Sequence, residues 1–166
     1  MRADDIERLL QEVDSLIREG ISLEPSGTDE TIRQVRLLTA SACLLNGRAL
    51  ASYGGHPGEN RGIELVEQVV GAAFQTFGGE HTHPDPFEKA AMLLRGITQG
   101  HPFGDGNKRT GFMLAGYYLD IMGLKPAGER WNTDVIEDLS IAVSSGRIRD
   151  VTMIAERLRN LWGVNR

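Results

Sequence analysis

The 166-residue sequence lacks several features that would assign it to a specialised class of protein. It has a single cysteine, Cys43, which excludes a disulfide within the chain, and its apolar neighbours predict a buried, unreactive thiol. No apolar run reaches the length that spans a bilayer and no secretory signal opens the sequence, so we expect a cytoplasmic protein without membrane association. Lys and Arg number 18 against 23 Asp and Glu, and this net charge of -5 argues against direct nucleic-acid binding.

The sequence also lacks alternating strand and helix patterns, internal repeats and low-complexity tracts. What it has instead is apolar residues at helical spacing, bounded by helix caps and glycines. Asp85, followed by Pro86, and Asp150 are predicted to cap two of these helices. An apolar fraction of 40% and a charged fraction of 25% are typical of a globular protein. We therefore predict an all-α fold of about six or seven helices. Residues 1–30 would form an N-terminal helix and a connector, and residues 31–166 the main domain.

The residues best suited to catalysis gather in the stretch 101–109, HPFGDGNKR, between two of the predicted helices. A helix begins within it, and a helix start attracts phosphate through unpaired N–H groups and partial positive charge. Lys108 and Arg109 add fixed positive charge, and Arg109 can bind a phosphate through two parallel hydrogen bonds. The carboxylate of Asp105 can hold Mg2+. His101 is the natural proton acceptor near neutral pH.

The other residues of this stretch suit a loop that closes around phosphates. Gly104 and Gly106 let the backbone approach a ligand closely, and Asn107 would help the two cations to hold the phosphates. Phe103, between polar neighbours, would insert into the core and anchor the loop. The alternative is a plain polar turn between two helices, but such a turn does not need a base, a metal ligand and two cations within nine residues. We therefore interpret residues 101–109 as a phosphate-binding catalytic loop.

This stretch resembles the signature of the Fic/Doc family, in which histidine is followed at fixed spacing by phenylalanine, an acidic residue, asparagine and arginine. The position of Lys108 is glycine in the adenylyl-transferring branch and lysine in the Doc (death-on-curing) branch. The adenylyltransferases usually carry a second arginine where this sequence has Phe112. Both features indicate the Doc branch. The resemblance covers about residues 34–163 and includes the segments 53–55, 87–90 and 161–163.

The resemblance implies a transferase that uses ATP and Mg2+ to modify a Ser or Thr hydroxyl of a target protein, with His101 as the base. As in Doc, the transferred group would be the γ-phosphate and the target a translation elongation factor, with growth arrest as the result and an antitoxin as a second partner. Transfer of AMP, as in the Fic branch, is one alternative, and a non-catalytic member that only binds a partner is another. The intact set of His101, Asp105, Asn107 and Arg109 argues against a non-catalytic member.

In this family an extended flap precedes the motif helix and pins the target segment beside the phosphates, by adding it as a strand. The resemblance places this flap around residues 74–84, just before the helix that leads into the catalytic loop. Its candidate contacts with a target are Phe74, Gln75, Thr76 and Phe77. The local sequence is compatible both with a short strand here and with an extension of the preceding helix.

Residues 15–20, SLIREG, resemble the autoinhibitory pattern of the family, in which a glutamate pairs with the second motif arginine. Phe112 replaces that arginine here, which favours a plain amphipathic helix over residues 4–19 with Ser15 and Glu19 facing solvent. Doc toxins resemble only the later part of this chain, so the extra helix could instead cover the groove that an antitoxin fills in them. On this hypothesis, deleting residues 1–20 raises the transferase activity, and unchanged activity would contradict it.

Overall fold

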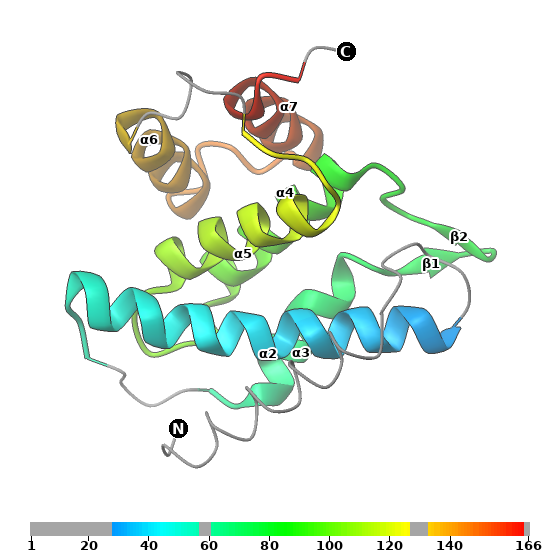
Figure 1. The fold of residues 1–166 in the computed structure, drawn as a ribbon, viewed down its shortest axis with the longest axis horizontal. Helices are drawn as coiled ribbons and strands as arrows, with labels where there is room; N and C mark the ends of the chain where they lie inside the picture. The colour runs from blue at the N-terminus through cyan, green and yellow to red at the C-terminus, as the bar shows by residue number, and fades with distance from the viewer. Residues whose placement is uncertain (1–27, 57–60, 127–132, 165–166) are drawn as a thin grey trace.

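The computed structural model describes residues 28–56, 61–126 and 133–164 (Figure 1). These residues form six helices and one short hairpin: α2 (Thr28–Tyr53), α3 (Ile63–Ala72), β1 (Thr76–Phe77), β2 (Glu80–His81), α4 (Pro86–Gly100), α5 (Asn107–Ile121), α6 (Thr133–Ser144) and α7 (Val151–Trp162). This confirms the predicted all-α fold. The predicted helix over residues 4–19, with Ser15 and Glu19, lies outside the described residues. Within them, no helix combines the length and the apolar character needed to span a bilayer.

The helices form three layers, with α4 and α5 in the middle, α2 and α3 on one side, and α6 and α7 on the other (Figure 1). Helix α4 packs against α3, α5, α6 and α7. Its fully buried side chains include Leu93, Leu94 and Ile97. The helix begins as the sequence predicted, since Asp85 Oδ1 accepts the N–H groups of Phe87 and Glu88 at 2.8 and 3.1 Å and Pro86 follows the cap. Helix α4 therefore forms the centre of the core.

Helices α4 and α5 cross closely because α5 presents Gly111 to α4. A Cβ atom at Gly111 would lie 2.7 Å from the Thr98 Oγ1 atom and 2.9 Å from the Leu94 carbonyl oxygen, so a larger side chain does not fit. The loop of residues 101–106 joins these same two helices. The close crossing therefore fixes the positions of both ends of the loop.

The C-terminal helix α7 packs on α4, and its last residue reaches α5. Asp150 caps α7, as predicted, by accepting the N–H of Met153 at 2.9 Å. Trp162 is 1% exposed, and its indole N–H donates to the Leu124 carbonyl oxygen at 3.1 Å. The Trp162 ring lies 6.3 Å from the ring of Phe112. Helix α7 thus supports α5, the helix that follows the predicted catalytic loop.

The hairpin is attached to the N-terminal end of α4 through a cluster of Phe74, His81 and Lys89. The Lys89 side chain is 4% exposed, and its ammonium lies 5.4 Å from the centroid of the Phe74 ring. Burial lowers the pKa of Lys89. Burial and then the charge of Lys89 lower the pKa of His81, opposed by a hydrogen bond to the Phe74 backbone. Protonation of His81 would therefore place a second cation beside a buried one.

We expect the protein to lose stability in acid partly through His81. Because the folded state lowers the pKa of His81 below 6.5, the unfolded chain binds the proton more readily. The contribution of His81 to the free energy of unfolding is therefore complete above the unfolded-state pKa and falls as the pH drops through the folded-state pKa. Urea unfolding at about pH 7.5 and about pH 5.5 measures this effect. A His81→Gln variant should lose less stability between the two pH values, and an equal loss in both proteins would contradict the prediction.

Candidate active site

The predicted catalytic loop joins the C-terminal end of α4 to the N-terminal end of α5. His101 is the C-cap residue of α4, with φ 46° and ψ 53°, and no other non-glycine residue in the described ranges has a positive φ. This left-handed conformation is unfavourable by roughly 1–2 kcal/mol for an ordinary side chain, and such strain is concentrated at functional sites. It turns the chain out of the helix, and the His101 side chain is exposed to solvent. The imidazole is therefore accessible to a substrate.

Two hydrogen bonds between the Asn107 side chain and the Phe103 backbone close the loop. The Asn107 Oδ1 atom accepts the Phe103 N–H at 3.0 Å, and Nδ2 donates to the Phe103 carbonyl oxygen at 2.8 Å. Phe103 is 4% exposed and lies in the hydrophobic core. We predicted from the sequence that Asn107 would help to hold phosphates. The structure instead places its side-chain amide inside the loop, where it fixes the shape of the loop.

The start of α5 is open toward a ligand. Gly106 is the N-cap residue, in a left-handed conformation with φ 77°, and as a glycine it supplies no side chain to cap the helix. The hydrogen bond from the Thr110 N–H to the Gly106 carbonyl oxygen, at 2.9 Å, closes the first turn. The three N–H groups before Thr110 have no acceptor within the helix, so this turn is suited to bind an anion. Lys108 and Arg109 are exposed on the same turn and add positive charge to it.

Asp105 is held by backbone groups on two sides. Its Oδ1 atom accepts the Gly106 N–H at 2.6 Å, and its Oδ2 atom accepts the His56 N–H at 3.4 Å. The Asp105 carbonyl oxygen accepts a hydrogen bond from Asn46 Nδ2 at 2.8 Å, and the same nitrogen donates to Thr110 Oγ1 at 3.0 Å. Asn46 is 5% exposed in α2. A buried residue of a distant helix therefore fixes both the loop and the first turn of α5.

The carboxylate of Asp105 lies beside the open helix start and is exposed. In the part of the chain that the structure describes, no group of three or more His, Cys, Asp or Glu side chains could hold a metal ion. Magnesium ions usually bind one or two carboxylates together with phosphate oxygens and water. The exposed Asp105 side chain fits a metal ion that is bound jointly by the protein and a phosphate ligand.

The hairpin that we predicted to be a target-docking flap lies away from this loop. It precedes the N-terminal end of α4, whereas His101 follows the C-terminal end. A helix of 15 residues is about 22 Å long, so its two ends cannot lie side by side. The structure thus keeps all four candidate residues away from the loop: Phe74 is 2% exposed in the core, Gln75 and Thr76 are exposed, and Phe77 is 90% exposed on the hairpin.

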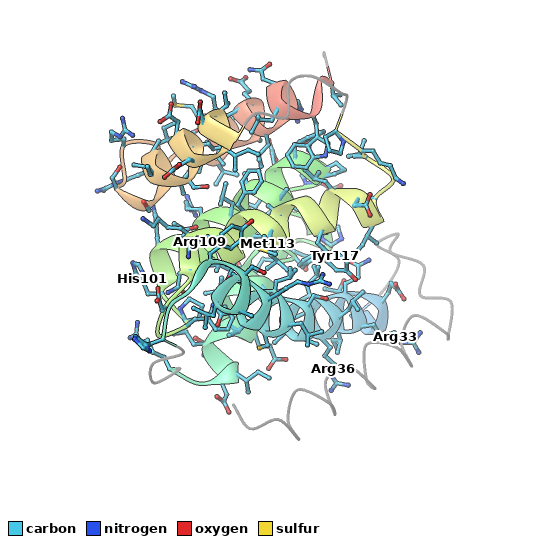
Figure 2. The ribbon with its side chains drawn as sticks, turned by 60° about the vertical axis from the view of Figure 1, so that its left-hand side comes forward. Arg33, Arg36, His101, Arg109, Met113 and Tyr117 are labelled. Carbon is cyan, nitrogen blue, oxygen red and sulfur yellow. The ribbon has the colours of Figure 1, made fainter. Side chains whose placement is uncertain are left out.

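Residues 53–56 and Arg61 flank the loop instead. The Arg61 N–H donates to the Pro102 carbonyl oxygen at 3.2 Å, and the Arg61 guanidinium donates to the Gly100 carbonyl oxygen at 3.4 Å. The guanidinium carbon of Arg109 lies 5.0 Å from the centroid of the Tyr53 ring. Arg109 and His101 lie at the same end of the fold (Figure 2). The resemblance of segment 53–55 to the family indicated that these residues matter. It did not predict that they lie beside the loop of residues 101–106.

Gly55 is required beside the Asp105 carboxylate, and we expect Gly55→Ala to weaken Mg2+-dependent nucleotide binding. A Cβ at this position would lie 2.6 Å from Asp105 Oδ2 and 2.7 Å from Leu50 Cδ2. Displacing the carboxylate should weaken binding by roughly 10- to 100-fold, by analogy with the effect of misplacing a reacting group. Isothermal titration calorimetry with ATP and Mg2+ measures this change in affinity. Gly54→Ala is the matched control, because Gly54 also has positive φ, 74°, but a Cβ there contacts nothing within 4 Å. Equal effects of the two substitutions would contradict the prediction.

The fold and the loop together define a class of protein: an all-α domain in which an exposed histidine shortly precedes a helix start that has no N-cap side chain. Residues 36–119 match the sequence model of the Fic/DOC family, and the chain belongs to this family, as the motif predicted. It is 34% identical to Toxin Doc of Mycolicibacterium smegmatis over 98 residues, which cover 59% of this chain and 74% of that protein. It is 29% identical to Protein kinase doc of Escherichia phage P1 over 119 residues, which cover 72% of this chain and 89% of that protein.

Proposed function

We propose that this chain is a Doc-type toxin that transfers the γ-phosphate of ATP to a Ser or Thr hydroxyl of a target protein. The observation that carries the proposal is the exposed His101 beside the open, positively charged start of α5. A hydroxyl can attack a phosphorus atom efficiently when a base and an anion site are held next to each other. The relatives named Toxin Doc and Protein kinase doc support the same assignment.

In the proposed reaction, His101 removes the proton from the target hydroxyl while the hydroxyl oxygen bonds to the γ-phosphorus. The bond between this phosphorus and the oxygen bridging it to the β-phosphate breaks, and ADP leaves. The N–H groups at the start of α5, with Lys108 and Arg109, stabilise the negative charge on the phosphates. Asp105 would hold Mg2+, which supplies further charge neutralisation when bound.

Two residues favour transfer of the γ-phosphate over transfer of AMP. Phe112 occupies the position where the AMP-transferring branch has its second arginine, and the Phe112 side chain is 8% exposed against Trp162. The second turn of α5, where Phe112 lies, thus has no arginine at this position to bind a phosphate. Lys108 occupies the position of the glycine in that branch, and its side chain would crowd the place of the α-phosphate.

The test is mass spectrometry of a translation elongation factor incubated with the protein, ATP and Mg2+, beside a His101→Ala control. A gain of one phosphate that is absent in the control would support the proposal. A gain of one AMP would show that the interpretation of Lys108 is wrong while His101 keeps its role. If no modification is found, the same assay without residues 1–20 distinguishes an inhibited enzyme from a wrong target. The Doc assignment also implies an antitoxin as a partner, which co-purification would identify.

A further inference from the structure

We propose that Tyr53 is a positioning residue that holds the guanidinium of Arg109 in place to receive a phosphate. The inference rests on the proposed function, in which Arg109 is one of the phosphate ligands. Tyr53 is the last residue of α2, and its ring centroid lies 5.0 Å from the guanidinium carbon of Arg109. This separation is within the range of about 6 Å over which a cation is attracted to the face of an aromatic ring.

The contact with the Tyr53 ring does not neutralise the charge of Arg109. A guanidinium has five N–H donors, so those that do not face the ring can still bind a phosphate. Among the described residues, the ion pairs join other partners, and no carboxylate neutralises Arg109. Tyr53 thus restricts the movement of a long side chain without cancelling its charge.

Tyr53 lies on the same face of α2 as the residues that contact the loop. Asn46, Leu50 and Tyr53 follow one another at helical spacing, and Asn46 and Tyr53 are about two turns apart. Asn46 donates to the Asp105 carbonyl oxygen and to Thr110 Oγ1, and Leu50 lies 3.4 Å from where a Cβ of Gly106 would be. One face of α2 therefore contacts the loop, its last glycine and the first turn of α5.

Tyr53 has little role in the core that would explain an aromatic ring at this position. It is 67% exposed and does not belong to the hydrophobic core, so its removal leaves no buried cavity. An exposed tyrosine can still attract a cation through the face of its ring. Here the contacted group is the cation at the phosphate end of the site.

The test is calorimetric titration of the full chain with ATP and Mg2+, comparing wild type, Tyr53→Phe and Tyr53→Leu, each with Arg109 and with Arg109→Ala. Tyr53→Phe keeps the ring face and should bind like wild type. Tyr53→Leu should weaken binding by roughly two- to fivefold, the effect expected of an exposed cation–π contact. In the Arg109→Ala background, Tyr53→Leu should have no further effect, which separates positioning of Arg109 from a direct contact with the nucleotide or a general loss of structure.

Each other outcome contradicts the inference in a distinct way. If wild type binds ATP and Mg2+ and Tyr53→Leu binds equally well, Tyr53 does not position Arg109, and the proposed function is unaffected. If Tyr53→Leu weakens binding equally in the Arg109→Ala background, Tyr53 contacts the nucleotide itself or the fold. If neither the full chain nor the chain without residues 1–20 binds ATP and Mg2+, the proposed function fails and the inference fails with it.

Discussion

Replacing His101 with alanine should lower the rate of phosphate transfer by about 100- to 10,000-fold, the usual contribution of a general base. The imidazole is exposed at the end of α4, beside the helix start that would bind the phosphates. Residues 101–109 contain no other histidine that could accept the hydroxyl proton. Single-turnover incorporation of phosphate from labelled ATP into the target measures the effect.

His101→Asn is the control that separates loss of the base from a change in the backbone conformation at residue 101. The left-handed conformation of His101 is accessible to asparagine, whereas alanine adopts it less readily. Both variants should be nearly inactive, and His101→Asn should bind ATP and Mg2+ like wild type because the loop keeps its shape. Full turnover by His101→Asn would show that His101 orders the loop rather than accepting the proton.

Replacing Trp162 with alanine should lower the free energy of unfolding by about 3–5 kcal/mol, as expected for a large buried aromatic side chain. Trp162 is 1% exposed, lies 6.3 Å from Phe112 and lies 3.7 Å from where a Cβ of Gly116 would be. Its loss would also leave the Leu124 carbonyl oxygen without its indole donor. Urea unfolding measures the change at constant pH.

Met153→Ala is the matched control on the same helix. Met153 is 52% exposed, so its truncation should change the free energy of unfolding by no more than about 0.5 kcal/mol. If the two substitutions had equal effects, α7 would not support the core as the structure indicates. The matched region of the family ends at residue 119, so this experiment asks whether the helices beyond it are needed to hold α5.

The features that could be predicted from sequence depend on nearby residues. The Asp85 and Asp150 caps were predicted correctly because a cap forms within one turn of the helix it begins. The hairpin strands β1 and β2 could not be distinguished from a helix end, because two-residue strands show no periodicity. The motif also predicted the family correctly, since its residues are contiguous.

The features that were missed depend on contacts between distant parts of the chain. The hydrogen bond from Asn46 to the Asp105 carbonyl joins residues 59 positions apart. The sequence around Asn46 contains no pattern from which this partner could be predicted. The flap was assigned by its order in the chain, but α4 carries the hairpin and His101 to opposite ends of the core. Asn107 is different, because its contact is local: its side chain bonds to the Phe103 backbone four residues away, which its assignment to phosphate from the motif did not anticipate.

The anchoring of the loop by α2 limits how this site could be moved to another scaffold. A designer who grafted residues 101–109 alone between two new helices would leave the Asp105 carbonyl without the Asn46 donor and its carboxylate without the His56 N–H. The new scaffold would also need a glycine at a close helix crossing to set the distance between the ends of the graft. The smallest segment that could be transferred with its loop contacts intact therefore extends from α2 through α5. The motif alone lacks the residues that hold the loop in place.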